Sequence, residues 1–516
     1  MGRVDTVERI TTGPRTLPGG APAARFTASV LVHEPGRLLV TTTTLGPGED
    51  PYLDDPGGDA APVFPPACAL EAVAQGWAAL TGHDGPPVIE AVEFGQPLVV
   101  PRDRVVELRL TAVAGAHPST ATVTLRSAYL GDEVERVRAR LRHRGAGGVR
   151  DRMPVVWHPA ATVPVPTALP VPPARHPEQP PLAINTAREV YDTLVRRDRR
   201  LHRLLRYREI TTSGCVAELA GASAMWWFGA APPEPLILGD PGLRDALLHA
   251  VQAWAPDAVL QPLGVDRIWL AGAGPYEQVT LYALRRERDG DVHRFDLEAV
   301  AGGRVVERWT GLRLRLVPAG RPPGPWPAQV FGPYLHRRLR ELAGFDAAAV
   351  LEPGLRRERR REHTALAVSR LLGARTTVRY RPDGRPELGG GRCVSAAHGG
   401  AYTMAVVSGT PVGCDLEPVA RREHAEWRRL LGGHLALADL IAAETGEPLS
   451  TAATRVWSAL ESLHKVGVTA VTPLTYARHT PDRWVLLTAG RWRVATCVVA
   501  LRGAPAELSV AVASAG

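Results

Sequence analysis

The stretch ACALEAVAQGWAAL, residues 67–80, is apolar on nearly every side when it is written as a helix at about 100° per residue. Only Glu71 and Gln75 carry polar side chains in it. A helix that is apolar all round has to be enclosed by other parts of the chain. Strand-like runs flank it at 26–34, 38–45, 88–94, 105–113, 121–129 and 133–141. Residues 25–144 therefore predict an antiparallel sheet curled around one central helix.

A second set of elements follows the same plan. Its helix is predicted over 241–254, because Asp240 fits an N-cap and Pro241 fits the first helical position. Its strands are predicted at 208–219, 265–271, 277–284, 292–300 and 305–317. Prolines crowd residues 154–185 between the two sets. They predict either a semi-rigid linker or an extended strap along the neighbouring domain.

Length and composition limit the class of protein. A chain of 516 residues with 45% apolar and 22% charged residues predicts about three globular units. The polar start carries no secretory signal, and no apolar run is long enough to span a bilayer, so we expect a cytoplasmic protein without membrane contact. The odd number of cysteines argues against a disulfide framework. They are Cys68, Cys215, Cys393, Cys414 and Cys497.

The net charge of +8 comes almost entirely from arginine. The arginines are not interleaved with the aromatic side chains of a base-stacking platform, so we do not expect nucleic-acid binding. A basic surface also steers phosphate-bearing ligands and acidic proteins.

Two segments carry a resemblance to a known family. They are VFP at 63–65 followed by ALEAVAQ at 69–75, and GDPGLRDALLH at 239–249. Together with the repeated plan, they resemble the dehydratase domain of polyketide synthases. They are most similar to the dehydratase of enediyne-type iterative synthases, which carry a transferase domain directly behind it. The resemblance covers most of residues 25–320 and implies a double hotdog, that is, two curled antiparallel sheets, each around a central helix.

Dehydration of a β-hydroxyacyl thioester needs a base for the α-proton and an acid for the leaving hydroxyl. In the family that this chain resembles, the first hotdog supplies a histidine in H-x-x-x-G-x-x-x-x-P and the second supplies an aspartate in D-x-x-x-Q/H. Asp245 and His249, which share one face of the predicted helix, match the second pattern. Aligned on Pro65, the first pattern has Pro56 in place of the catalytic histidine and Ala60 in place of the glycine.

Proline cannot accept a proton, and His33 and His83 lie well away in sequence. Asp54 and Asp55 are close, but an exposed aspartate is a weak base at neutral pH. Of the tyrosine and the following Gly/Pro turn of the family, only Tyr191 is present. The sequence therefore favours a domain that keeps the dehydratase fold without lyase activity and that docks an acyl chain or a carrier protein.

The segment PVGCDLE, residues 411–417, alternates like a strand. Asp415 and Glu417 then lie on one face together with Gly413, whose missing side chain leaves room. Carboxylate oxygens are the ligands that hard divalent cations prefer. This segment therefore predicts part of a metal site.

The segment WSALESLHK, residues 457–465, predicts a helix with Thr454, Ser458, Glu461 and Lys465 in one stripe. Glu461 would complete a three-carboxylate site with Asp415 and Glu417. Lys465 lies one turn further on and would bind a phosphate of the same substrate. A metal next to a phosphate-binding lysine is the equipment of phosphoryl transfer. The alternative is a surface D-x-E beside an ordinary Glu–Lys pair.

These two segments resemble the paired signatures of 4′-phosphopantetheinyl transferases, V/I-G-hydrophobic-D-hydrophobic-E and W-S/T-x-K-E-S/A-x-x-K. The resemblance covers about residues 355–505. It implies transfer of the phosphopantetheine arm of coenzyme A to a serine of an acyl carrier protein. It also implies Mg²⁺ on Asp415, Glu417 and Glu461, with Glu461 and Lys465 as the catalytic residues.

The same resemblance gives further coenzyme A contacts. Arg385 falls in the family's G-K/R-P turn, and His398 falls in its S-H-x-G segment, where it would contact a phosphate. Ala397 replaces the usual serine, and Leu460 replaces the first lysine of W-S-x-K-E, so we expect weaker coenzyme A binding rather than lost chemistry. Basic residues at the start of the helix 355–372 are further candidates among which the sequence does not choose.

The sequence thus predicts an α+β chain. Its domains are a first hotdog at 1–150, a linker at 151–185, a second hotdog at 186–320, a connector at 321–354 and a Mg²⁺-dependent phosphopantetheinyl transferase at 355–516. The expected partners are coenzyme A and an acyl carrier protein of polyketide biosynthesis. Two alternatives stay open: an active dehydratase with a non-standard base, and a non-catalytic docking partner of a synthase. Monomer and homodimer both stay open, with the dimer preferred, and the identity of the carrier protein is undetermined.

Overall fold

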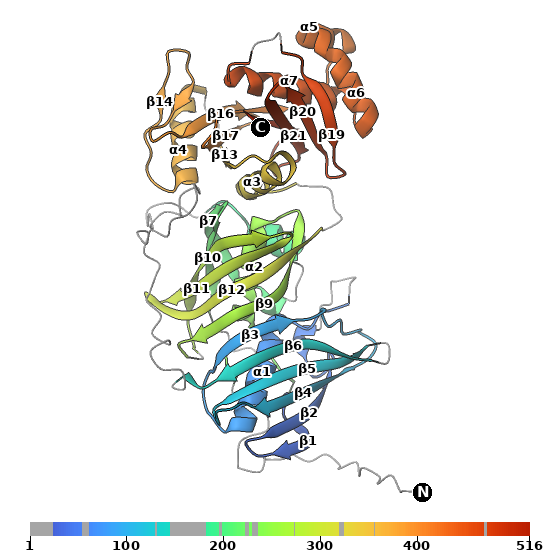
Figure 1. The fold of residues 1–516 in the computed structure, drawn as a ribbon, viewed down its shortest axis with the longest axis vertical. Coiled ribbons are helices and arrows are strands. Elements are labelled where there is room, and N and C mark those ends of the chain that lie inside the picture. Colours follow the sequence, from blue (N-terminus) through green and yellow to red (C-terminus); the bar gives the residue numbers. More distant parts are fainter. Residues whose placement is uncertain are drawn as a thin grey trace.

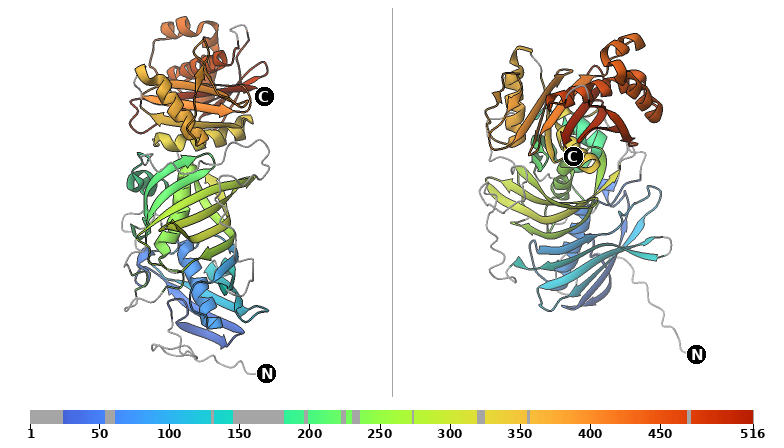
Figure 2. Two further views of the ribbon diagram at one scale, coloured as in Figure 1. Left: turned by 90° about the vertical axis from the view of Figure 1, so that its left-hand side faces the viewer. Right: turned by 45° about the horizontal axis from the view of Figure 1, so that its top comes forward.

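The computed structural model describes residues 24–53, 61–129, 132–144, 182–195, 199–221, 226–229, 236–272, 274–318, 325–354, 357–468 and 472–515. Two curled halves and a C-terminal part follow one another along the long axis of the molecule (Figure 1). The same stacking is visible from the side and from above in Figure 2.

The first half confirms the predicted enclosed helix. The helix α1 (Pro66–Thr81) ends at Gly82 in the left-handed conformation, and its residues from Ala67 to Trp77 are all buried. The strands that curl around it are β1 (Ser29–Glu34), β2 (Leu38–Leu45), β3 (Val88–Phe94), β4 (Val106–Ala114), β5 (Thr120–Tyr129) and β6 (Asp132–Arg142).

The second half repeats the plan around the helix α2 (Pro241–Val251), which is extended by a short 3-10 turn, η5 (Gln252–Trp254). Asp240 caps α2 as predicted, because its carboxylate accepts hydrogen bonds from the backbone N–H groups of Gly242 at 2.7 Å and Leu243 at 3.4 Å. The strands are β7 (Leu204–Thr211), β8 (Gly214–Ala220), β9 (Ala258–Leu270), β10 (Gln278–Asp289), β11 (Val292–Ala301) and β12 (Arg304–Pro318). The predicted strand at 208–219 is thus two strands joined by a turn.

One sheet runs through both halves, where two separate sheets were predicted. Its strand order is β1-β2-β4-β5-β6-β3-β9-β12-β11-β10-β8-β7, so the second half mirrors the first strand by strand. The join is the antiparallel pairing of β3 with β9, in which Ile89 lies opposite Ile268 and Val92 opposite Val265. This pairing satisfies the backbone groups of two strands that would otherwise be sheet edges.

The C-terminal part contains three smaller sheets. The strands β13 (Ala347–Pro353), β17 (Tyr402–Ser408) and β16 (Cys393–Gly399) form one, and β14 (Arg379–Tyr380) with β15 (Pro386–Glu387) form a hairpin. The third has the order β18-β22-β21-β20-β19. Its strands are β18 (Val412–Pro418), β19 (Thr475–His479), β20 (Trp484–Ala489), β21 (Trp492–Val499) and β22 (Leu508–Ala515). The helices are α3 (Ala328–Ala343), α4 (Arg360–Leu372), α5 (His424–Leu431), α6 (Leu435–Thr445) and α7 (Leu449–Lys465).

The predicted connector at 321–354 is an integral part of the structure. Its strand β13 pairs along its whole length with β17, and its helix α3 packs on β13. Tyr334 of α3 accepts a hydrogen bond of 2.8 Å from the indole of Trp484. The Ala-rich run at 347–349 reads as neutral in sequence, and only its pairing with β17 makes it a strand.

The helix α3 also lies against the second hotdog, on β7 and η5. Arg337 of α3 pairs with Asp257, and Glu341 pairs with Arg288 of β10 at 3.2 Å. Arg502 pairs with Glu189 at 3.0 Å. One cluster of buried apolar residues extends from Phe26 in the first hotdog to Val512 in β22. The C-terminal part is therefore packed directly on the double hotdog.

Other predictions concern residues beyond those described. The proline-rich segment 154–185 lies outside the described residues except for 182–185. Of the helices that the structure describes, none combines the length and the apolar character needed to cross a membrane.

Candidate active sites

The helix α7 lies directly on β18, and Gly413 makes this approach possible. A Cβ atom on Gly413 would lie 2.0 Å from the backbone oxygen of Ser462 and 3.1 Å from a methyl group of Val466. The space beside this glycine is therefore filled by the helix, and the prediction that it leaves room for a cation is wrong. Its effect on the site is indirect, because it brings the last turns of α7 next to Asp415.

Lys465, at the end of α7, meets Asp415 of β18. Its ammonium nitrogen Nζ donates to Asp415 Oδ1 at 3.1 Å and to the backbone oxygen of Cys414 at 2.7 Å. The other carboxylate oxygen, Asp415 Oδ2, is buried and has no hydrogen-bond partner among the described residues. The predicted strand and helix thus bring these two residues together, as an ion pair.

Glu417 and Glu461 lie within electrostatic reach of the same pair. Burial raises the pKa of Asp415, the charge of Lys465 opposes this, and the charge of Glu461 adds to the rise. Burial also raises the pKa of Glu417, and so does the charge of Asp415, while a hydrogen bond from Trp457 lowers it. Carboxyl groups that raise one another's pKa are typical of functional sites.

The donor set suits a hard divalent cation, because it consists of carboxylate oxygens and includes the unpartnered Asp415 Oδ2. Within the described ranges, however, no three His, Cys, Asp or Glu side chains are gathered closely enough to hold a metal ion. Asp415, Glu417 and Glu461 therefore lie within electrostatic reach of one another without forming a metal site. The positive charge that pairs with Asp415 is the ammonium of Lys465.

His398 lies on the other side of this site, on β16. Its ring nitrogens contact two hydroxyls, Nδ1 with Thr403 at 3.0 Å and Nε2 with Thr364 at 3.3 Å. Its pKa is lowered to about 4 by burial first and then by the charges of Arg360, Lys465 and His363. His398 is thus neutral at pH 7 in a surrounding of positive charge, an arrangement suited to an anionic ligand.

Arg360 and His363 of α4 are site candidates that the sequence analysis did not single out. They stand in the charge run 356–363, which by itself indicates only a solvated face. The structure selects these two residues from the charge run, because they are the ones on α4 whose charges act on His398.

Arg385 is held near the end of α7. Its guanidinium donates to the backbone oxygen of His464 at 2.9 Å and pairs with Asp383 at 3.4 Å. It therefore binds the last turn of α7, next to Lys465, in addition to any ligand contact. Leu460 packs against a second apolar cluster, formed mainly by α6, α7 and β20, in keeping with its predicted place on the apolar face.

Lysine usage carries a signal that the sequence analysis missed. The chain contains sixty arginines and a single lysine, which is Lys465. An ammonium is a compact point charge on a flexible stem, whereas a guanidinium is a planar fork. The one lysine lies where α7, which carries Glu461, meets β18, which carries Asp415 and Glu417.

The second candidate site lies in the double hotdog, on α2. His249 Nε2 and Asp245 Oδ2 are 2.9 Å apart, and both side chains are buried. Tyr191 lies edge-on to His249, with 5.6 Å between the ring centroids. The Tyr191 hydroxyl accepts hydrogen bonds from the backbone N–H groups of Arg203 and Leu204 at 3.1 and 3.0 Å. Tyr191 therefore has a structural role in holding the start of β7.

In the first hotdog, Cys68 of α1 lies within electrostatic reach of Asp245. Burial raises the pKa of the Cys68 thiol strongly, and the charges of Asp245, Asp50 and Glu71 raise it further. The thiol is thus protonated at pH 7 and is no base. Pro56, Ala60, Asp54 and Asp55 lie outside the described residues, as does the position where the family that this chain resembles has its histidine.

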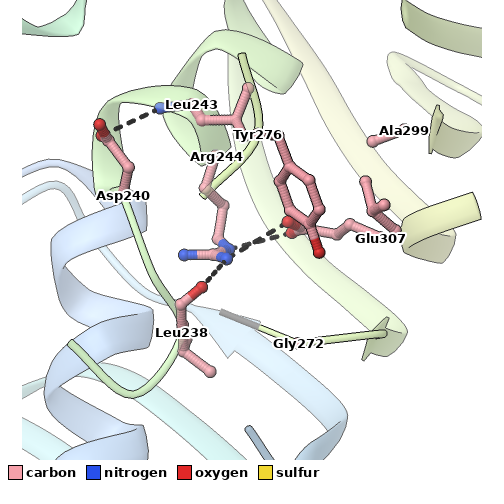
Figure 3. A pocket seen from close by; sticks show the side chains of 9 residues that line it. Leu238, Asp240, Leu243, Arg244, Gly272, Tyr276, Ala299 and Glu307 are labelled. Carbon is pink, nitrogen blue, oxygen red and sulfur yellow. Dashed lines mark hydrogen bonds and ion pairs between the residues drawn. The ribbon is translucent and has the colours of Figure 1, made fainter. Parts of the chain in front are cut away.

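A small pocket lies beside α2, with a water-accessible volume of about 10 Å³, room for about one water molecule. Arg244 lines it and donates to Glu307 at 2.9 and 3.2 Å and to the backbone oxygen of Leu238 (Figure 3). Tyr276 also lines the pocket. At this size the pocket does not accommodate an acyl chain.

Comparison with protein families identifies the double hotdog. A family model described as polyketide synthase dehydratase domain matches residues 29–128, and one described as polyketide synthase dehydratase N-terminal domain matches residues 168–324. Residues 29–324 therefore contain a double hotdog of the polyketide synthase dehydratase type. Both matches end before the C-terminal part.

Solved structures of dehydratase domains are similar to this part of the chain. The dehydratase domain from the CurF module of curacin polyketide synthase is 16% identical, covers 57% of this chain and 100% of its own, and has a TM-score of 0.42. The dehydratase domain of RzxB from Pseudomonas fluorescens is 14% identical, covers 56% and 98%, and has a TM-score of 0.39. No curated protein matches the chain.

Proposed function

We propose that the C-terminal part transfers the 4′-phosphopantetheine arm of coenzyme A to a serine of an acyl carrier protein in polyketide biosynthesis. The observation that carries the proposal is the packing of α7 on β18. It brings Asp415, Glu417, Glu461 and Lys465 within electrostatic reach of one another. His398, in its surrounding of positive charge, is the next neighbour.

Asp415, Glu417 and Glu461 would hold the Mg²⁺ ion, which supplies Lewis-acid polarisation of the coenzyme A pyrophosphate oxygens when it is bound. The other roles belong to side chains. Glu461 accepts the proton of the carrier serine, directly or through a water molecule. The serine oxygen then forms a bond to the β-phosphorus, and the bond between that phosphorus and the oxygen bridging the two phosphates breaks, which releases 3′,5′-adenosine bisphosphate.

Lys465 and His398 stabilise the negative charge that develops on the transferred phosphate and on the leaving group. Arg385, anchored on the last turn of α7, adds a cation for the coenzyme A phosphates, and Arg360, on the same helix as His363, adds another. The missing lysine at Leu460 removes one such contact, which weakens coenzyme A binding without removing the reacting groups.

The test is the loading of an apo carrier protein with coenzyme A and Mg²⁺, followed by intact mass. The chain should add a phosphopantetheine group, and Asp415→Ala should abolish the addition. Asp439→Ala, which removes an exposed carboxylate from α6, is the matched control and should load like the wild type. Undiminished loading by Asp415→Ala would refute the site assignment.

We further propose that the dehydratase-type domain lacks lyase activity, because Pro56 stands where the base belongs and the Cys68 thiol, within electrostatic reach of Asp245, is protonated. Its role is then to dock the carrier protein or its acyl chain. This proposal follows the resemblance to enediyne-type synthases, in which a transferase domain comes directly behind the dehydratase. A β-hydroxyacyl thioester incubated with the protein should stay unchanged, both as such and on a carrier. Dehydration that Asp245→Asn abolishes would instead establish an active dehydratase with another base.

A further inference from the structure

The ammonium of Lys465 is the cation that contacts Asp415. It lies 3.1 Å from Asp415 Oδ1 and 2.7 Å from the backbone oxygen of Cys414, two oxygens with the hard character that a divalent cation also prefers. The Asp415 side chain is 9% exposed and that of Lys465 is 28% exposed, so the pair is only partly screened by solvent.

The carboxylates around this ammonium outnumber it. Glu461 and Glu417 both interact electrostatically with Asp415, and Asp415 Oδ2 is buried with no hydrogen-bond partner among the described residues. The one ammonium that contacts Asp415 pairs with Oδ1 and leaves Oδ2 without a direct partner among the described residues. A divalent cation would satisfy the charge of these carboxylates better than the ammonium does, provided that the ammonium moves away.

The charge of Lys465 also acts on a group outside the ion pair, His398 of β16. This charge contributes to lowering the pKa of His398, so the ammonium lies within electrostatic reach of that ring. The side chain has a flexible four-carbon stem, which can pivot between two positions. It is also the single lysine in a chain with sixty arginines, and its ammonium is a compact point charge whereas a guanidinium is a planar fork.

We propose that Lys465 is an exchangeable counter-ion: it holds the carboxylate seat in the ligand-free protein and is displaced by the metal, after which its ammonium binds the phosphate. This inference rests on the proposed function. Metal binding and phosphate binding then promote each other, because the metal releases the ammonium that the phosphate uses. The exchange prevents the three carboxylates from repelling one another when no metal is bound.

The test measures the binding of Mn²⁺, as a paramagnetic probe for Mg²⁺, from the electron paramagnetic resonance signal of the free ion. Without coenzyme A, Lys465→Met should bind Mn²⁺ about tenfold more tightly than the wild type, because the competing cation is gone. Arg375→Met, which removes the same charge from the exposed turn after α4, should bind like the wild type. Coenzyme A should increase Mn²⁺ affinity in the wild type and much less in Lys465→Met.

A second readout follows the lysine itself. Labelling with ¹³Cε-lysine gives one side-chain signal for the whole chain, because there is one lysine. Mg²⁺ alone should move this signal towards that of a solvated lysine, and coenzyme A should move it again.

Three outcomes separate the possibilities. Equal or weaker Mn²⁺ binding by Lys465→Met, while the wild type binds Mn²⁺ and loads a carrier, overturns the exchange and leaves the proposed function standing. No Mn²⁺ binding by either protein, with or without coenzyme A, overturns both. Loss of binding in the double variant Asp415→Asn, Lys465→Met supports the assignment of Asp415 to the metal.

Discussion

Gly413 determines how closely α7 approaches β18, and through this distance it determines where Glu461 and Lys465 lie. A side chain at this position would meet the backbone oxygen of Ser462, which cannot move aside like the end of a flexible side chain. The glycine in the signature segment is therefore required by the packing of two elements, and the carboxylates depend on it only through that packing.

Gly413→Ala should push α7 away from β18, break the contact between Lys465 and Asp415 and lower the free energy of unfolding by about 1–3 kcal/mol. Carrier loading should fall at the same time. Gly409→Ala, in the turn before β18 where a Cβ would meet nothing within 4 Å, is the control. Denaturant unfolding and loading assays check both variants. Wild-type stability and activity in the Gly413→Ala variant would contradict this account of the glycine.

At the scale of single elements, sequence periodicity predicted the helices and strands whose apolar pattern is regular. The helix expected at 67–80 is α1 (Pro66–Thr81), because a helix that is apolar on all sides is stable only when other parts of the chain bury it. The strand expected at 208–219 became β7 and β8, because the run of strand formers continues through the turn at Thr212 and Ser213. Sequence periodicity also cannot say which strand pairs with which, so the join of β3 with β9 was missed.

The same limit applies to the candidate site. The helical spacing predicted that Glu461 and Lys465 share one face of a helix, and the resemblance to a family predicted that this face lies beside Asp415. The structure pairs Lys465 with Asp415 at 3.1 Å. Arg360 and His363 were beyond prediction, because only the packing of α4 on β13 and β17, which brings α4 to His398 of β16, selects two members of a charge run. That Lys465 sits on Asp415 itself, rather than pointing only at a ligand, depends on the distance between two elements far apart in sequence.

The β3–β9 join makes its own prediction. Gly264 of β9 lies where β3 and β12 approach, and a Cβ there would be 2.3 Å from the backbone oxygen of Val92 and 2.2 Å from the Arg313 guanidinium. Gly264→Ala should therefore open the join and cost about 1–3 kcal/mol of unfolding free energy. Amide hydrogen exchange should become faster in β3 and β9 and stay unchanged in β5. Gly48→Ala, where the added Cβ would meet nothing within 4 Å, is the control. Equal exchange protection of β3 and β9 in the two variants would contradict this account of Gly264.

At the scale of the whole molecule, buried histidines lie at the junction between the double hotdog and the C-terminal part. His293 of β11 packs edge-on against Trp254, and neither ring nitrogen has a hydrogen-bond partner among the residues described. His336 of α3 contacts the backbone oxygen of Ala347 through Nδ1 at 2.9 Å. Arg285 of β10 acts on both histidines.

The two pKa values determine how acid affects this junction. Burial lowers the pKa of His293 to about 3, and the charges of Arg285, Arg288 and Arg337 add to this. Burial lowers that of His336 to about 4; Arg285 and Arg340 lower it further, while the contact with Ala347 and the charge of Asp346 oppose them. Since the unfolded histidines take up protons near pH 6.5 and the folded ones do not, their stabilising contribution is complete above that pH and declines as the pH falls towards 4.

His293→Phe should therefore make the protein less sensitive to acid. The wild type should lose about 2 kcal/mol of unfolding free energy through His293 between pH 7.5 and pH 5, and the phenylalanine variant should not, because its ring packs on Trp254 and cannot be protonated. Thermal unfolding at the two pH values measures the difference, with His424→Phe at the exposed start of α5 as the control. Carrier loading at pH 5 should follow the same order, because the C-terminal part is packed on β7, β10 and η5 and loses that support when the junction loosens. An unchanged loss of stability in His293→Phe would place the acid sensitivity elsewhere in the chain and would show that the site proposed in the C-terminal part does not depend on this junction.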